Sequence, residues 1–99
     1  MNTQIQSIHF KADQKLKDYI NIKIDKLDTF YDGIMDVQVF LKVVNTSAKE
    51  NKTVEIKVNA KHNSFIQTET ATTFEAAADI AIEALKVQVK RYKGKVVAH

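Results

Sequence analysis

Apolar residues recur at steps of three and four after Asp13, a pattern typical of a helix with one buried face. The members of this stripe are Leu16, Ile20, Ile24, Leu27 and Tyr31. The Asp13 carboxylate can cap the start of the helix, and we predict that the helix runs to about Tyr31. Gly33 follows closely, as a helix terminator should.

The period changes to two in the middle of the chain, where apolar and polar side chains alternate as in half-buried strands. The alternating apolar positions are Val37, Val39, Leu41 and Val43, then Val54, Ile56, Val58 and Ala60. The polar segment Asn45–Lys52 is predicted to be a loop between these two strands. Lys61–Asn63 is predicted to be a short hairpin connection to a further strand, Ser64–Thr70. A weaker alternation predicts an opening strand over Thr3–Phe10.

A last helix is predicted to begin at a capping-box pattern, in which Thr72 caps the helix and Glu75 reaches back to it. This helix should run to about Lys93 or Lys95. Its expected buried face consists of Phe74, Ala78, Ile82, Leu85, Val89 and Tyr92. The element order β-α-β-β-β-α predicts an α+β fold, with one four-stranded mixed sheet and two helices packed on one face.

The composition is that of one globular domain: 99 residues, 44% hydrophobic and 27% charged. The chain has no cysteine, which excludes a disulfide framework and a thiolate zinc site. The first residues lack the pattern of a signal peptide, and no apolar run approaches the roughly 18 residues that span a bilayer. We therefore expect a cytoplasmic protein that does not contact membranes.

The net charge of +3 conceals an asymmetry along the chain. Residues 1–83 carry ten basic and twelve acidic side chains, whereas residues 84–99 carry five basic and no acidic ones. One or two cations would complement the negative end of a helix dipole, and five exceed that role. This end of the chain therefore suggests a polyanionic partner.

Charges on the two helices are also sorted by side, at about 100° per residue. One flank of the first helix carries Lys15, Lys23 and Lys26. The opposite flank carries Asp18, Asp25, Asp28 and Asp32, and Lys17 is the one cation that departs from this sorting. One edge of the last helix carries Lys86, Lys90 and Lys93. If the helices pack side by side, the two basic edges would line one groove or ridge suited to RNA phosphates, although an ordinary solvated surface would carry the same lysines.

An enzyme is the first alternative, and the sequence gives it little support. His9, His62 and His99 lie far apart, without the spacing of metal ligands. The carboxylates of Asp79 and Glu83 share a helix face, where such pairs are usually solvated and keep ordinary acidity. We expect no catalysis, no cofactor and no small-molecule substrate.

A protein-interaction module is the second alternative. Ile22, Ile80 and Val87 lie off the apolar stripes, so they are candidates for exposed contacts. Phe40 and Phe65 are candidates to cover the second face of the sheet or to form a self-association surface. Salt separates the two readings, because RNA binding weakens steeply with salt whereas an apolar contact hardly changes.

Four strings, taken in order, resemble segments of one known family. Lys26–Ile34 is similar to the end of the family's first helix, and Val39–Val43 to its second strand. Thr73–Asp79 resembles the opening of the last helix, and Leu85–Lys95 its lysine-rich ending. The family is that of the short ribosome hibernation promoting factors, also known as ribosome-associated inhibitor or sigma-54 modulation proteins, with an S30AE-type domain.

The resemblance implies a fold like that of double-stranded RNA-binding domains. It implies a hibernation factor that binds the small ribosomal subunit in the decoding channel, against 16S ribosomal RNA. There it would sterically block messenger RNA and transfer RNA, inhibit translation and preserve idle ribosomes. It also implies one ribosome-binding domain over residues 1–99, with a core of about 3–95, no C-terminal dimerisation domain and a monomeric free state. The alternative is a small interaction module with a basic surface that acts without ribosome binding.

Carried over residue by residue, the resemblance implies a set of RNA-contacting cations on the two helices. They are Lys23, Lys26, Lys86, Lys90, Arg91, Lys93 and Lys95. Arg91 and Lys95 are expected to point away from the lysine edge, toward the helix end. The chain departs from the family pattern at Val87, where the family has arginine, and at Glu75, where it has tyrosine.

Overall fold

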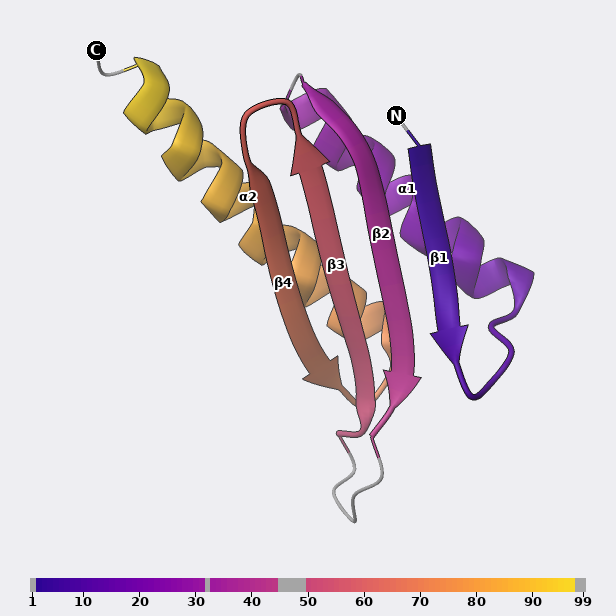
Figure 1. Cartoon of the computed structure of the whole chain (residues 1–99). Coiled ribbons are helices and arrows are strands. Elements are labelled where there is room, and N and C mark those ends of the chain that lie inside the picture. Colours follow the sequence, from indigo (N-terminus) through magenta and orange to yellow (C-terminus); the bar gives the residue numbers. More distant parts are fainter. Residues whose placement is uncertain (1, 32, 45–49, 98–99) are drawn as a thin grey trace.

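The computed structural model describes residues 2–31, 33–44 and 50–97, with the backbone alone for 93–97. The elements are β1 (Asn2–Ile8), α1 (Gln14–Phe30), β2 (Ile34–Val43), β3 (Lys52–Ala60), β4 (Ser64–Ala71) and α2 (Phe74–Val97). The four strands form one sheet in the order β1-β2-β3-β4, in which β1 is parallel to β2 and the other pairs are antiparallel. Both helices lie on the same face of this sheet (Figure 1). The predicted α+β class, element order and mixed sheet are confirmed.

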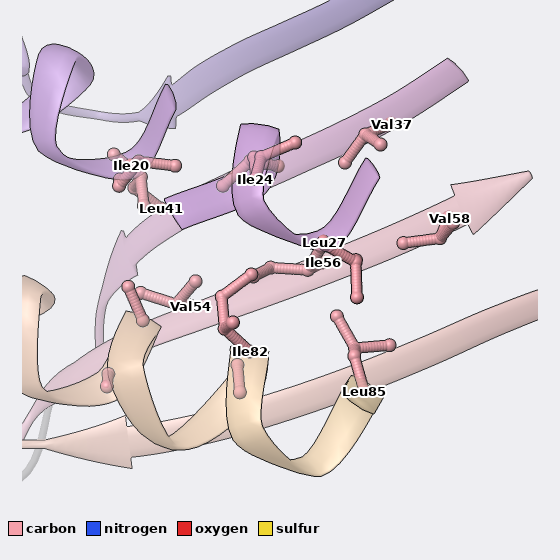
Figure 2. Packing of buried hydrophobic residues seen from close by; sticks show 14 of the residues in the cluster. Ile20, Ile24, Leu27, Val37, Leu41, Val54, Ile56, Val58, Ile82 and Leu85 are labelled. Atoms are coloured by element: carbon pink, nitrogen blue, oxygen red, sulfur yellow. The ribbon is translucent and has the colours of Figure 1, made fainter. Parts of the chain in front are cut away.

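The core lies between the sheet and the two helices, as the two sequence periods predict. Ile20, Ile24 and Leu27 of α1 face the sheet beside Ile82 and Leu85 of α2 (Figure 2). Below them lie the inward side chains of β2 and β3: Val37, Val39, Leu41, Val54, Ile56 and Val58. Each fully buried aliphatic side chain of this kind stabilises the fold by about 1.5–3 kcal/mol relative to exposure. Three buried alanines of α2 (Ala77, Ala78 and Ala81) leave room for the helix to approach its neighbours closely.

Both ends of α1 are as predicted, but the role of Gly33 is not. The Asp13 carboxylate accepts a hydrogen bond from the Leu16 amide at 2.8 Å, as an N-cap does. At the other end Tyr31 takes an extended backbone, and its amide donates to the Leu27 carbonyl at 3.1 Å. Gly33 lies beyond this cap and adopts φ +118° at the entry to β2. The glycine is therefore required by the turn into the strand, and not by termination of the helix.

The start of α2 corrects the predicted capping box by one residue. The Thr73 hydroxyl accepts from the Ala76 amide at 3.0 Å, and the Thr73 carbonyl accepts from the Ala77 amide at 3.1 Å. Thr73, and not Thr72, is thus the N-cap, which leaves Glu75 at the wrong position to close a box. A tertiary contact lies beside this cap: the rings of Phe74 and Phe10 stack with centroids 5.1 Å apart. The helix also runs past Lys95, to Val97.

Three strand predictions need correction. β1 ends at Ile8 and not at Phe10, because His9 takes a positive φ of 65° that turns the chain out of the sheet. Val43 is 47% exposed, since it pairs with Lys52 at the outer end of the ladder. Lys52 accordingly belongs to β3 and not to the loop. Residues 45–49 of the predicted loop lie outside the described residues.

Candidate nucleic-acid interface

The two helices leave a groove between them, with a volume of about 340 Å³. Its walls are made by Lys23, Lys26, Asp79, Ile82, Glu83 and Lys86. The two lysines of α1 are spaced three apart, and the three charged residues of α2 are spaced four and three apart, so each set occupies one edge of its helix. The structure thus brings the two basic edges predicted from the sequence together at three lysines. We call this site the interhelical groove.

A hydrogen-bonded cluster links the two helices inside the groove. The Tyr19 hydroxyl of α1 donates to Asp79 of α2, with its oxygen 2.8 Å from Oδ1 and 2.9 Å from Oδ2. Lys23 Nζ lies 3.3 Å from Asp79 Oδ1 and 5.5 Å from the centroid of the Tyr19 ring. The hydrogen bond to Asp79, followed by desolvation, raises the pKa of Tyr19 above 10.0, so the hydroxyl keeps its proton at neutral pH. The cluster holds both the ammonium and the carboxylate in place.

The three lysines of the groove have different electrostatic neighbours. Lys23 pairs with Asp79, and Lys86 Nζ lies 3.2 Å from Glu83 Oε1. Within the described part of the chain, Lys26 has no ion pair. Three cations therefore share the groove with two carboxylates, and its net charge is smaller than the count of lysines suggests. Phosphate groups are attracted by this positive balance, and Lys26 is the cation most available to them.

Among the other predicted RNA contacts, Lys90 and Arg91 do not line the groove. Lys90 is exposed on α2, and Arg91 lines a separate hollow of about 280 Å³ on the β4 side of the helix. The other residues of that hollow are Asn63, Ser64, Phe65, Gln88 and Tyr92. Gln88 closes part of the free edge of β4, because its amide donates to the Ile66 carbonyl at 3.1 Å and to Gln67 Oε1 at 2.8 Å. The side chains of Lys93 and Lys95 lie outside the described residues.

The sequence reasoning missed Asp79 in the wall of the groove and its hydrogen-bond partner Tyr19. The side chain of Asp79 is 44% exposed, in line with the expected solvation, but it also has two partners on α1. The sequence reasoning missed these partners because it considered one helix at a time, and Tyr19 and Asp79 lie 60 positions apart in the chain. A signal did exist: Tyr19, Lys23 and Lys26 follow one another at steps of four and three, which places Tyr19 on the basic edge.

The opposite face of the sheet is uncovered and mostly polar. A hollow of about 370 Å³ lies on it, lined by Ile8, Phe40, Lys42, Val44, Thr53, Glu55 and Thr68. Phe40 lies on this face, as predicted for a residue that covers it. Phe65 does not, because it is buried on the helix side, where its ring contacts Tyr31 and Tyr92 edge to face. Ile22, Ile80 and Val87 are exposed, as expected.

Among the described residues, no group of three or more histidine, cysteine or acidic side chains is placed to hold a metal ion. None of the helices in the described ranges is both long and apolar enough to cross a membrane.

These observations define a class: a small α+β domain with a lysine-lined groove between two helices on one face of a mixed sheet. The chain belongs to the family described as sigma 54 modulation protein / S30EA ribosomal protein, whose sequence profile matches residues 3–97. The family resemblance stated from the sequence is confirmed. Its description names a modulation protein and a ribosomal protein, and no enzyme.

Individual relatives agree with this assignment. Two proteins of Pseudomonas putida, one from strain KT2440, are named ribosome hibernation promoting factor; each is 29% identical over 100 residues, which cover 96% of this chain and 89% of the relative. The N-terminal domain of Thermus thermophilus Protein Y is 28% identical, with a TM-score of 0.77 over 93% of this chain and 99% of that one. A ribosomal subunit interface protein of Coxiella burnetii has a TM-score of 0.84 over 95% and 99% of the two chains, and at 16% identity it supports the fold alone.

Proposed function

We propose that this chain is a non-enzymatic ribosome hibernation factor of the cytoplasm, which binds the small ribosomal subunit through 16S ribosomal RNA. It occupies the decoding channel as one domain, blocks messenger RNA and transfer RNA sterically, and so inhibits translation and preserves idle ribosomes. The observation that carries the proposal is the meeting of Lys23, Lys26 and Lys86 in one groove of a chain from this family. The names of the relatives, a hibernation promoting factor and a subunit interface protein, support the same partner.

The groove suits the backbone of a structured RNA. Lysines act as point charges toward phosphates and carry little base information, so recognition depends on shape and charge. Helical RNA is recognised mainly in this way, through its backbone and minor groove. Lys90 and Arg91 add two cations on α2 beyond the groove, and the sequence of α2 continues with Lys93 and Lys95. In this mechanism the domain fills space that the ligands of translation need, and electrostatic attraction holds it there.

The test is co-sedimentation of the purified protein with isolated small subunits at low and high salt. The first variant carries Lys23→Gln, Lys26→Gln and Lys86→Gln. The matched control carries the same three charge changes on the exposed lysines Lys42, Lys57 and Lys61, at the sheet and the hairpin.

We expect the wild type and the control to bind at low salt and the groove variant to bind weakly. If the three groove lysines contact three phosphates, raising salt from about 50 to about 200 mM lowers their combined contribution to affinity by up to about 40-fold. Absence of wild-type binding to small subunits contradicts the proposal. Equal losses in the groove variant and the control place the RNA-binding surface elsewhere.

A second candidate function is a protein-interaction module that acts without ribosome binding. The observation in its favour is the exposure of Ile22, Ile80 and Val87 on the helices, together with Phe40 on the uncovered sheet face. An apolar partner bound at these residues would resist salt, so salt-insensitive binding in the same experiment would favour this candidate.

A further inference from the structure

One carboxylate of the interhelical groove lies where its negative charge weakens the binding of phosphates. Asp79 is fixed in the wall of the interhelical groove, beside the ammonium of Lys23, where its charge repels an approaching phosphate. Glu83 lies in the same wall but differs in its setting: its side chain is 73% exposed, and its one partner among the described residues is Lys86 on its own helix. Asp79 is held from the facing helix by two side chains, and so it has a defined orientation.

The bonds of Asp79 leave part of its acceptor capacity unused. A carboxylate has about four acceptor positions, two on each oxygen. Oδ1 contacts the Tyr19 hydroxyl and Lys23 Nζ, whereas Oδ2 contacts the Tyr19 hydroxyl alone. The side chain remains 44% exposed and lines the groove, so a hydrogen-bond donor in the groove can approach the carboxylate. The site therefore presents an oriented anionic acceptor next to cations that suit phosphates.

The sugar–phosphate backbone of RNA offers one group that needs such an acceptor, the ribose 2′-hydroxyl. DNA lacks this donor, and carboxylates are known acceptors for ribose hydroxyls in nucleotide sites. We propose that Asp79 accepts a hydrogen bond from a ribose 2′-hydroxyl of the strand whose phosphates lie on Lys23, Lys26 and Lys86. Asp79 is then the residue by which the groove prefers RNA to DNA. This inference rests on the proposed function, because it requires that RNA bind in the groove.

The acceptor is organised before RNA arrives. Tyr19 and Lys23 fix the carboxylate, so little side-chain entropy is lost when the hydroxyl donates to it. The same two partners reduce the repulsion that Asp79 exerts on phosphates, because Lys23 balances its charge at 3.3 Å. If no ligand group donates to it, the Asp79 carboxylate links the two helices but weakens phosphate binding, and removing it would strengthen binding to any polyanion.

The experiment measures the affinity for three duplexes of one sequence by fluorescence anisotropy at one low salt concentration: RNA, 2′-O-methyl RNA and DNA. The 2′-O-methyl duplex keeps the charge and the A-form shape of RNA but has no hydroxyl proton to donate. We expect the wild type to bind RNA about tenfold more tightly than 2′-O-methyl RNA, as one hydrogen bond to a charged acceptor provides. Asp79→Ala should bring this ratio close to one.

Two further variants keep the result interpretable. Glu83→Ala removes a carboxylate from the same groove; it should raise the affinity for all three duplexes alike and leave the ratio unchanged. Asp79→Asn keeps the size and one acceptor oxygen, so it should give an intermediate ratio, and it carries the test if the alanine variant does not fold.

The failure of this inference is distinct from that of the proposed function. A wild type that does not separate RNA from 2′-O-methyl RNA, or that binds neither, overturns the role of Asp79. A ratio that stays at the wild-type value in both Asp79 variants does so as well. A third outcome is that the wild type prefers RNA to 2′-O-methyl RNA, the Asp79 variants lose this preference, and the protein does not co-sediment with small subunits. This outcome would support the role of Asp79 and contradict the ribosomal partner.

Discussion

The charge balance of the interhelical groove makes a prediction that can be tested with two single substitutions of opposite sign. Lys26→Gln removes the lysine that has no ion pair within the described residues. Glu83→Gln removes the carboxylate that lies 3.2 Å from Lys86 and frees that lysine to neutralise a phosphate. One substitution lowers the net charge of the groove by one, and the other raises it by one.

The magnitude follows from counterion release. Each phosphate that a cation neutralises contributes about 0.9 to the slope of log affinity against log salt. Lys26→Gln should reduce this slope by about 0.9. The loss of affinity between about 50 and about 200 mM salt should then be smaller than that of the wild type by a factor of about 3.5. Glu83→Gln should increase the slope by up to about 0.9, since an exposed pair is only partly neutralised. The double variant should return to the wild-type slope.

The assay is a salt series of RNA binding by anisotropy, with Lys57→Gln on the opposite face of the molecule as the control of equal charge. The control should keep the wild-type slope, because screening confines its influence to about 10 Å at about 0.1 M salt. Equal slopes for Lys26→Gln and Lys57→Gln would refute the assignment of phosphates to the groove. A Glu83→Gln slope below that of the wild type would refute the idea that its carboxylate competes for Lys86.

Three further predictions concern the fold. Thr73→Ala should lower the free energy of unfolding by about 1 kcal/mol and the melting temperature by about 4–8 °C. Thr72→Ala should change both quantities little. A larger effect of Thr72→Ala in thermal unfolding would show that Thr72 caps the helix, as the capping box predicted. Ile56→Val, at a fully buried position of β3, should lower the free energy of unfolding in urea by about 0.5–1.5 kcal/mol. Ile66→Val, at a position that is 53% exposed, should lower it by less than about 0.5 kcal/mol. Equal losses would contradict the core described above. The hydrogen bond to Asp79 raises the pKa of Tyr19 in the folded protein, so as the pH rises past 10.0 this tyrosine ionises first in the unfolded chain. The free energy of unfolding of the wild type should therefore fall relative to that of Tyr19→Phe above this pH. Plots of the two free energies against pH that stay parallel there would argue against the hydrogen bond.

The element order, the buried faces and the basic helix edges were predictable from the sequence, because helix and strand periods are local properties of the chain. Leu16, Ile20, Ile24 and Leu27 are buried at the steps that their spacing predicts. The three groove lysines follow from the same rule, since residues at steps of three and four share an edge. That these edges adjoin depends on how the helices pack, and the sequence left that as a hypothesis.

The features that the sequence did not predict depend on tertiary contacts. Thr72 and Thr73 are equivalent as local capping residues, and the stacking of Phe74 on Phe10 accompanies the choice of the second. The bonds of Asp79 to Tyr19 cross between helices, so no local pattern indicates them. The resemblance to double-stranded RNA-binding domains and the RNA contacts themselves stay predictions.

The sorting of charges on α1 has a kinetic consequence. Lys23 and Lys26 line one flank of the helix, in the groove, whereas Asp25 and Asp28 are exposed on its other flank. A polyanion therefore attracts one side of the molecule and repels the other, which exerts a torque while the two are still separated by solvent. If RNA is the partner, as proposed above, such a torque turns the domain toward its binding orientation before contact and raises the fraction of collisions that succeed. The arrangement thus favours a fast, salt-sensitive association rate even where the net charge of the chain is only +3.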